Sequence, residues 1–162
     1  MKFKLSKEET VELGMELYLK GWNCGEATST AFIRALGYDT DLFPRAGTSL
    51  GSGFGGEHRY QCGALSSAVL ASGAAFGRDD PDGDRSPSNN LATQFIKDFE
   101  EKFGTFNCYE LVGLEPGSGD SWNIPYKAQN KREEKCIHLV RYSLEHWYNL
   151  AEEFINEQGS VT

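Results

Sequence analysis

Residues 63–75 read Gly-Ala-Leu-Ser-Ser-Ala-Val-Leu-Ala-Ser-Gly-Ala-Ala, and this stretch decides the fold. Ten of these 13 residues are glycine, alanine or serine, and the chain carries no charge between Arg59 and Arg78. Small side chains let neighbouring backbones approach closely, but they gain little from lipid, so the pattern favours a buried helix over a membrane span. We therefore predict a central, small-residue-rich helix from Cys62 to Phe76.

Two helices are predicted before this stretch, and both begin with a capping box. The first spans Ser6 to Lys20 and has a glutamate three residues after the capping serine. The second begins at Asn23, again with a glutamate three residues later, and ends at Gly37. Residues 38–59 are predicted to form a loop that ends in a glycine-rich run.

Three further helices are predicted after the central one. Two of them span about 91–103 and 107–113, and the last and longest contains Cys136 about two turns after its start and continues through Phe154. The apolar residues of the last recur at three- and four-residue spacing, as one face of a helix requires. Residues 79–90 and 114–125 are predicted as loops, and strand signals are nearly absent. The sequence thus predicts an all-α, single-domain helical bundle covering residues 1–162.

The charge of the chain limits its partners. The 162 residues include 16 Lys and Arg against 24 Asp and Glu, a net charge of −8. Such a surface repels phosphate backbones and anionic lipid head groups, so we expect no nucleic acid and no membrane insertion. The first ten residues, MKFKLSKEET, lack an apolar segment, so we expect no secretory signal and a cytoplasmic location. A homodimer is left open, because small amphipathic helical proteins often pair.

Four cysteines carry the chemical information: Cys24, Cys62, Cys108 and Cys136. The cytosol keeps ordinary thiols reduced, so disulfide staples are not expected. No Cys-x-x-Cys pair occurs, which argues against zinc-ribbon, thioredoxin and c-type haem motifs. If these thiols act together, the tertiary fold has to assemble them.

Three of these thiols are predicted at helix starts, since Cys24 and Cys108 each follow an asparagine and Cys62 opens the central helix. A helix N-terminus favours thiolate, the form that attacks disulfides and binds metals. Each of the four cysteines is also in phase with apolar residues of its own helix. We therefore expect four sulfur atoms to converge in the core, although a free cysteine often does no more than fill space.

These residues resemble a known family. Asn23-Cys24-Gly25-Glu26-Ala27, the block from Gly53 through Cys62-Gly63-Ala64 to Gly73, Asn107-Cys108-Tyr109-Glu110-Leu111 and Cys136 are similar to the C-GCAxxG-C-C family of redox-active proteins. All four cysteines fall on the four cysteines of that pattern, and the resemblance extends from about Leu13 to Leu150. Ser67 stands where the family's Cys-Gly-Ala-x-x-Gly element has its glycine, which predicts looser backbone contact there. The resemblance implies a helical protein with a redox or metal role.

Our first functional hypothesis is electron transfer through an iron–sulfur cluster, [2Fe–2S] in particular. Some relatives with added haem regions are iron–sulfur proteins, and clusters take four cysteine thiolates supported by amide hydrogen bonds. The predicted metal ligands are Cys24, Cys62, Cys108 and Cys136. The amides would come from the glycine-rich loop and the next helix, so Gly55, Gly56 and Gly63 are predicted cofactor-binding residues. The redox partner protein is not identified by this reasoning.

Two alternatives stay open. In the first, Cys62 is the nucleophile of a thiol–disulfide couple and Cys24 is the resolving thiol. In the second, the four cysteines hold a structural Zn²⁺ ion. His58, four residues before Cys62, is a further candidate cofactor-binding residue that could replace a ligand or act as a base, although most such loop histidines are ordinary.

Overall fold

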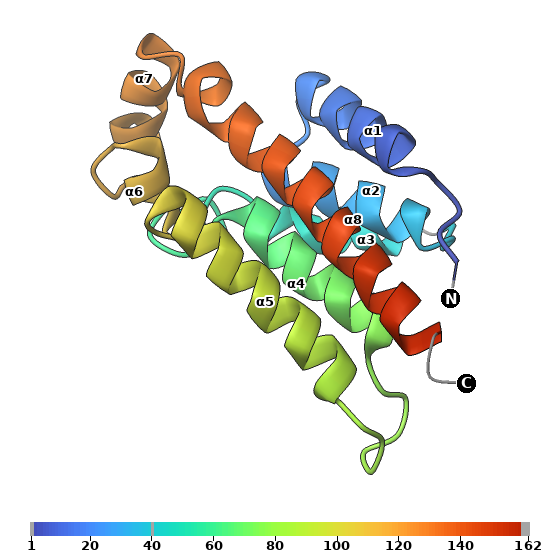
Figure 1. Ribbon diagram of the computed structural model, residues 1–162. Helices are drawn as coiled ribbons and strands as arrows, with labels where there is room; N and C mark the ends of the chain where they lie inside the picture. Colours follow the sequence, from blue (N-terminus) through green and yellow to red (C-terminus); the bar gives the residue numbers. More distant parts are fainter. Residues whose placement is uncertain (1, 40, 160–162) are drawn as a thin grey trace.

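The computed structural model describes residues 2–39 and 41–159, and its regular structure is helical (Figure 1). The elements are α1 (Lys7–Leu19), α2 (Cys24–Ala35), α3 (Leu42–Thr48), α4 (Gly63–Phe76), α5 (Ser86–Phe103), α6 (Cys108–Val112), α7 (Asp120–Ala128), the π-helical turn η1 (Arg132–Cys136) and α8 (Ile137–Gly159). Within the described ranges no strand forms, and Gln61 and Asn107 make one isolated antiparallel bridge. The predicted all-α class is confirmed.

The small-residue helix α4 lies at the centre of the bundle, as predicted. It packs against α2, α5 and α8, and it runs beside α5 in Figure 1. Its residues from Gly63 to Ala68 are all buried, as are Ala71 and Ser72. Small side chains on this face let three neighbouring helices approach one backbone, so the core is built around α4.

A buried aromatic contact joins α8 to both inner helices. Trp147 is fully buried, and its ring lies 4.6 Å from the ring of Phe32 on α2. Its indole N–H donates to Ser72 Oγ on α4 at 3.0 Å, so the one polar atom of the side chain is satisfied. Aromatic burial of this kind supplies much of the apolar area that stabilises a small helical core.

The first two helices begin where the capping pattern predicts. Ser6 and Glu9 form a capping box at α1, and Asn23 and Glu26 form one at α2. At α2 the Glu26 amide donates to Asn23 Oδ1 at 2.9 Å, and the Asn23 amide donates back to Glu26 Oε2 at 2.8 Å. This local signal fixes the residue at which α2 starts, and so places Cys24 in its first turn.

Two predicted loops contain helices instead. Residues 38–59 include α3, and residues 114–125 include the start of α7; both predictions were wrong there. Neither helix has a side-chain cap, and α7 contains Pro125, so the local signals are those of loops. Helix α3 forms against α2, and contact with the rest of the fold outweighs its weak propensity.

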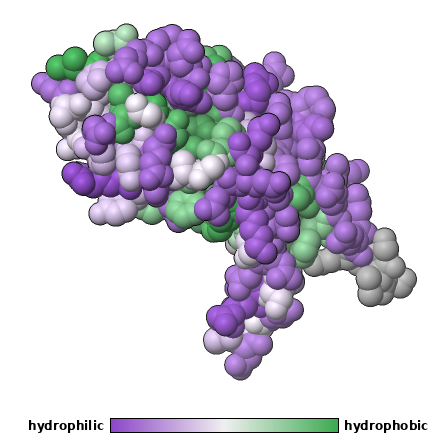
Figure 2. All heavy atoms as spheres, turned by 60° about the vertical axis from the view of Figure 1, so that its left-hand side comes forward, coloured by the Kyte–Doolittle hydropathy of each residue, from purple (hydrophilic) through white to green (hydrophobic). Residues whose placement is uncertain are grey.

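Helix α5 also starts earlier than predicted, at Ser86 rather than near Leu91. Its first turn contains a proline, which is compatible with that position because its missing N–H is not needed there. The preceding loop projects beyond α4 and α5 and is strongly hydrophilic in the space-filling view (Figure 2). Across the part of the chain that the structure describes, no helix combines the length and apolar character needed to span a bilayer.

Candidate thiol site

The fold brings the four cysteines into one region. Cys24, Cys108 and Cys136 line one pocket of about 120 Å³, together with residues of α1, α6 and α7. Cys62 does not line the pocket, but its thiol interacts with that of Cys24. Cys62 and Cys108 are buried, Cys24 and Cys136 are half-buried, and all four thiols are free.

A short backbone pairing holds Cys62 and Cys108 side by side. The Cys62 amide donates to Phe106 O at 2.8 Å, and the Cys108 amide donates to Tyr60 O at the same distance. The isolated bridge between the residues preceding the two cysteines belongs to the same pairing. Segments 46 positions apart in sequence are therefore fixed together by backbone hydrogen bonds rather than by side chains.

Cys24 occupies the most anion-stabilising environment of the four. The Cys62 thiol and the backbone amides of Ser52, Gly63 and Gly25 all act on its sulfur atom. Two of these amides belong to the first turns of α2 and α4, so two helix N-termini meet at one sulfur atom. The Cys62 hydrogen bond and these amides outweigh burial and lower the pKa of Cys24 from 9.0 to about 6.

The pKa of Cys62 shifts in the opposite direction. Donating its proton to Cys24 holds the pKa of Cys62 well above the ordinary value, and burial raises it further. The lowered pKa of Cys24 and the raised pKa of Cys62 favour a thiolate at Cys24 beside a protonated Cys62. This is the form in which a thiolate can attack while its neighbour stays protonated.

The other two thiols stay protonated. Burial raises the pKa of Cys108, and nearby Cys24 and Cys136 add to the effect. Burial also raises the pKa of Cys136 to about 11, although Tyr126 donates its hydroxyl to the Cys136 sulfur at 3.4 Å and partly opposes this. Cys136 lies on the π turn η1, which precedes the regular part of α8.

The glycines predicted to bind a cofactor divide into two groups. A Cβ atom on Gly63 would stand 2.8 Å from Cys24 Sγ, so a larger residue there would crowd the sulfur. Gly55 and Gly56 have positive φ and turn the loop, and neither lines the thiol pocket. The close approach occurs instead at Gly53, where a Cβ atom would lie 2.8 Å from that of Cys108. Nothing in a run of glycines distinguishes these positions from one another.

His58 lines the pocket, where its ring stacks on that of Trp122. Its ring lies parallel to that of Trp122, with centroids 3.9 Å apart, and its Nδ1 lies 2.9 Å from Gly117 O. Since a carbonyl oxygen accepts, Nδ1 carries the proton. Burial lowers the pKa of His58, so the ring is neutral at neutral pH.

The pocket also contains residues that the sequence analysis did not predict. The Arg132 guanidinium lies 3.9 Å from the centroid of the Tyr18 ring and donates to the backbone oxygens of Tyr18 and, at 3.1 Å, Trp22. Tyr18, Tyr126 and Arg132 all line the pocket. No local motif marks them, because their functional setting comes from helices α1, α7 and η1 meeting in space.

Ser67, which replaces the glycine of the Cys-Gly-Ala-x-x-Gly element, makes a tertiary contact with α2. Its Oγ lies 2.8 Å from Gly63 O in its own helix and 3.0 Å from Gly25 O in α2. The fully buried hydroxyl therefore ties the first turns of α2 and α4 together, next to the amides that meet at Cys24.

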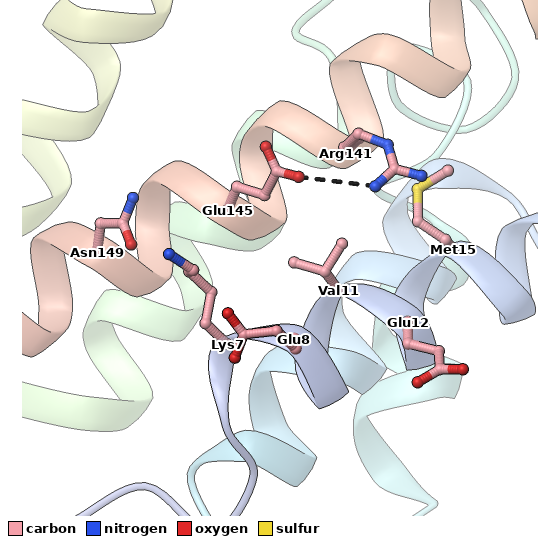
Figure 3. A pocket seen from close by; sticks show the side chains of 8 residues that line it. All are labelled: Lys7, Glu8, Val11, Glu12, Met15, Arg141, Glu145 and Asn149. Atoms are coloured by element: carbon pink, nitrogen blue, oxygen red, sulfur yellow. Dashed lines mark ion pairs between the residues drawn. The ribbon is translucent and has the colours of Figure 1, made fainter.

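A larger groove, of about 520 Å³, lies between α1 and α8 and contains no thiol (Figure 3). Val11 and Met15 of α1 line it, and Arg141 and Glu145 of α8 face each other at 3.6 Å. Its lining mixes apolar side chains with charges of both signs. We therefore place the candidate site at the smaller pocket, where the cysteines gather.

The donor set was also tested against a metal site. Among the residues that the structure describes, no three His, Cys, Asp or Glu side chains are arranged so that they could hold a metal ion. An iron–sulfur cluster or a structural zinc ion on the four thiols stays a prediction.

Fold and site together define a small helical protein with clustered thiols. The family model described as "Putative redox-active protein (C_GCAxxG_C_C)" matches residues 22–160, and the chain belongs to this family. The match covers all four cysteines. No protein of curated function and no solved structure matches the chain.

Proposed function

We propose that the chain is a thiol–disulfide redox protein whose working pair is Cys24 and Cys62. The observation that carries the proposal is the close approach of Cys24 to the start of α4: a Cβ atom on Gly63, the residue after Cys62, would stand 2.8 Å from Cys24 Sγ. The Cys62 thiol and the amides of Ser52, Gly63 and Gly25 also lower the pKa of Cys24. Two neighbouring thiols can exchange two electrons by forming one S–S bond. Cys24 lines the pocket, whereas Cys62 is buried behind it.

The reaction with a disulfide as oxidant can be written in two exchanges. The Cys24 thiolate attacks one sulfur of the substrate disulfide, whose S–S bond breaks and releases a thiolate. Cys62 then attacks Cys24 Sγ in the mixed disulfide, and its proton passes to a departing thiolate. The protein dithiol becomes a disulfide, and the substrate disulfide becomes two thiols.

This assignment reverses the roles that the sequence suggests. The sequence favours Cys62 as nucleophile because a loop precedes it. In the structure Cys62 is buried and keeps its proton, whereas Cys24 is half-buried and lines the pocket. These environments support Cys24 as nucleophile and Cys62 as resolving thiol.

The test is a redox titration of protein prepared without oxygen. We expect one two-electron transition in dithiothreitol buffers, and a disulfide-linked peptide pair containing Cys24 and Cys62 in mass spectrometry. Cys24→Ala and Cys62→Ala should abolish the transition, while Cys136→Ala, which removes a pocket thiol outside the pair, should keep it.

The same sample decides against the proposal in two ways. Failure to form a Cys24–Cys62 disulfide at any buffer ratio would overturn it. So would stoichiometric iron with sulfide, or stoichiometric zinc, that requires all four cysteines. The iron–sulfur and zinc hypotheses stay predictions that this metal analysis tests.

A further inference from the structure

The size of the thiol pocket restricts what can reach Cys24. Its volume is about 120 Å³. Pockets for drug-sized ligands are several-fold larger, at about 300–1,000 Å³. A disulfide held in a folded protein, with two backbones attached, does not fit into this space.

The chemistry of the lining indicates which small molecules suit it. The residues that line the pocket include Arg132, Tyr18 and Asn123, and none of the lining residues carries a carboxylate. These groups donate hydrogen bonds to oxygen and, in the case of Arg132, add a positive charge. Donors fixed in advance stabilise an oxyanion that forms during a reaction.

Other contacts fix the position of the charged donor. Arg132 is held by the Tyr18 ring and by the backbone carbonyls of Tyr18 and Trp22. An ordered guanidinium that lines a small pocket together with a nucleophilic sulfur suits a reaction whose leaving group is an oxygen anion.

Resting on the proposed function, we infer that the oxidant of the Cys24–Cys62 pair is a small hydroperoxide that enters this pocket. The Cys24 thiolate attacks the terminal oxygen, and an S–O bond forms as the O–O bond breaks. The leaving alkoxide or hydroxide takes a proton from water, which releases hydroxide to the solvent, and becomes an alcohol or water. Cys24 is then a sulfenic acid.

The second step uses the buried partner. The Cys62 sulfur attacks Cys24 Sγ, the S–S bond forms, and hydroxide leaves with the Cys62 proton as water. Two electrons have passed from the dithiol to the hydroperoxide, which becomes an alcohol (or water) and one further water. An external dithiol, oxidised in turn to its disulfide, returns the pair to the starting state by exchange.

Stopped-flow fluorescence can follow the oxidation, because Trp122 lines the pocket. The reduced full-length protein is mixed with hydrogen peroxide, tert-butyl hydroperoxide, bis(2-hydroxyethyl) disulfide or insulin. We expect hydrogen peroxide to oxidise the pair at least 100-fold faster than bis(2-hydroxyethyl) disulfide, and insulin disulfides to be slowest. Cys24→Ala should remove the fast phase.

A pair of surface variants tests whether the pocket is the route. Asn123 is exposed and lines the pocket, so Asn123→Trp places a large ring at its opening. Lys127→Trp adds the same ring elsewhere on α7 and is the matched control. Asn123→Trp should lower the rate of oxidation by tert-butyl hydroperoxide at least tenfold and the rate of oxidation by hydrogen peroxide less. The midpoint potential of the Cys24–Cys62 pair should not change. The rates of the control variant should match those of the unaltered protein.

The outcomes separate this inference from the proposed function. If the disulfide forms but bis(2-hydroxyethyl) disulfide or insulin reacts as fast as hydrogen peroxide, the inference is overturned and the proposed function stands. Equal rates in Asn123→Trp and Lys127→Trp would also overturn it. If no oxidant forms the Cys24–Cys62 disulfide, both fail.

Discussion

Gly63, the first residue of α4, packs directly against the sulfur of Cys24, the first residue of α2. A Cβ atom on Gly63 would stand 2.8 Å from Cys24 Sγ, so the sulfur occupies space that a larger residue at position 63 would fill. The same close approach brings the Gly63 amide near that sulfur atom, where it helps to lower the pKa of Cys24. Each helix N-terminus carries about half a positive charge, and the two act on one atom here. The missing side chain is thus a condition for the electrostatics of the site.

Replacing this glycine should therefore damage both the fold and the thiolate. Besides the sulfur, a Cβ atom on Gly63 would meet Leu50 O at 2.7 Å and Gly51 Cα at 2.9 Å, and backbone atoms cannot easily move away. We expect Gly63→Ala to lower the free energy of unfolding by about 1–3 kcal/mol in urea titrations. The control is Gly73→Ala on the same helix, where a Cβ atom meets nothing and stability should rise by up to about 1 kcal/mol. Equal effects of the two substitutions would contradict the packing argument.

The pH dependence of alkylation should report the Cys24–Cys62 pair. A thiolate reacts and a thiol does not, so the iodoacetamide rate at Cys24 should rise with pH through about 6 and then level off. Cys62→Ala removes the largest cause of the low pKa, so the inflection should move toward 9.0. Peptide mass spectrometry measures the rate, and Cys136→Ala serves as control because it removes none of these hydrogen bonds. An unshifted inflection in Cys62→Ala would show that the amides alone hold the thiolate.

The same thiolate should make stability depend on pH. The folded pKa of Cys24 lies below the unfolded value, so its contribution is fully present above pH 9 and is lost as pH falls through about 6. Between pH 6 and 9 the unfolding free energy of the reduced protein should therefore rise relative to Cys24→Ala. Urea titrations with a phosphine reductant measure the difference, and a constant difference across this range would contradict the low pKa.

Tyr126 should control the reactivity of Cys136. Its hydroxyl donates to the sulfur at 3.4 Å and partly opposes the rise in pKa that burial causes. Tyr126→Phe should raise the pKa of Cys136 above about 11 and slow its alkylation at pH 9 to 10. The control is Tyr148→Phe, whose hydroxyl donates to Leu5 O instead, and it should leave the rate unchanged.

A buried serine on α8 offers a stabilising substitution. Ser143 is fully buried, and its Oγ has no hydrogen-bond partner among the described residues. Removing an unpaired buried hydroxyl should raise the unfolding free energy, so we expect Ser143→Ala to gain about 1 kcal/mol. The contrast is Ser72→Ala, which strands the Trp147 indole N–H and should cost about 1–3 kcal/mol. Loss of stability in Ser143→Ala would indicate a partner for that hydroxyl.

Some of the fold could be predicted because its signals are local. The capping boxes at Ser6 and Asn23 act within one turn, and the small-residue composition of α4 predicts burial directly. Helices α3 and α7 were missed because their sequences carry no cap and include proline. Packing stabilises them, and packing involves residues that no local window contains.

The candidate site likewise contains residues that could be predicted from the sequence and residues that could not. The four cysteines could be selected from their helix positions and from the family pattern, but the roles of Tyr18 and Arg132 could not. These two residues are 114 positions apart in sequence, and they join only through the contact between α1 and η1. The glycine-rich run was recognised, but its contacts single out Gly53 and Gly63 rather than Gly55 and Gly56.

By itself, the sequence determined that the protein is helical and that Cys24 begins a helix, because capping and periodicity depend on near neighbours. Only the tertiary structure decided which thiol carries the charge. That choice depends on hydrogen bonds from Ser52, Cys62 and Gly63, which lie 28 to 39 positions away and reach Cys24 only in the folded chain. Electrostatic stabilisation falls off within a few ångströms, so a difference between two thiols of the same kind is set by which donors the fold brings to each sulfur.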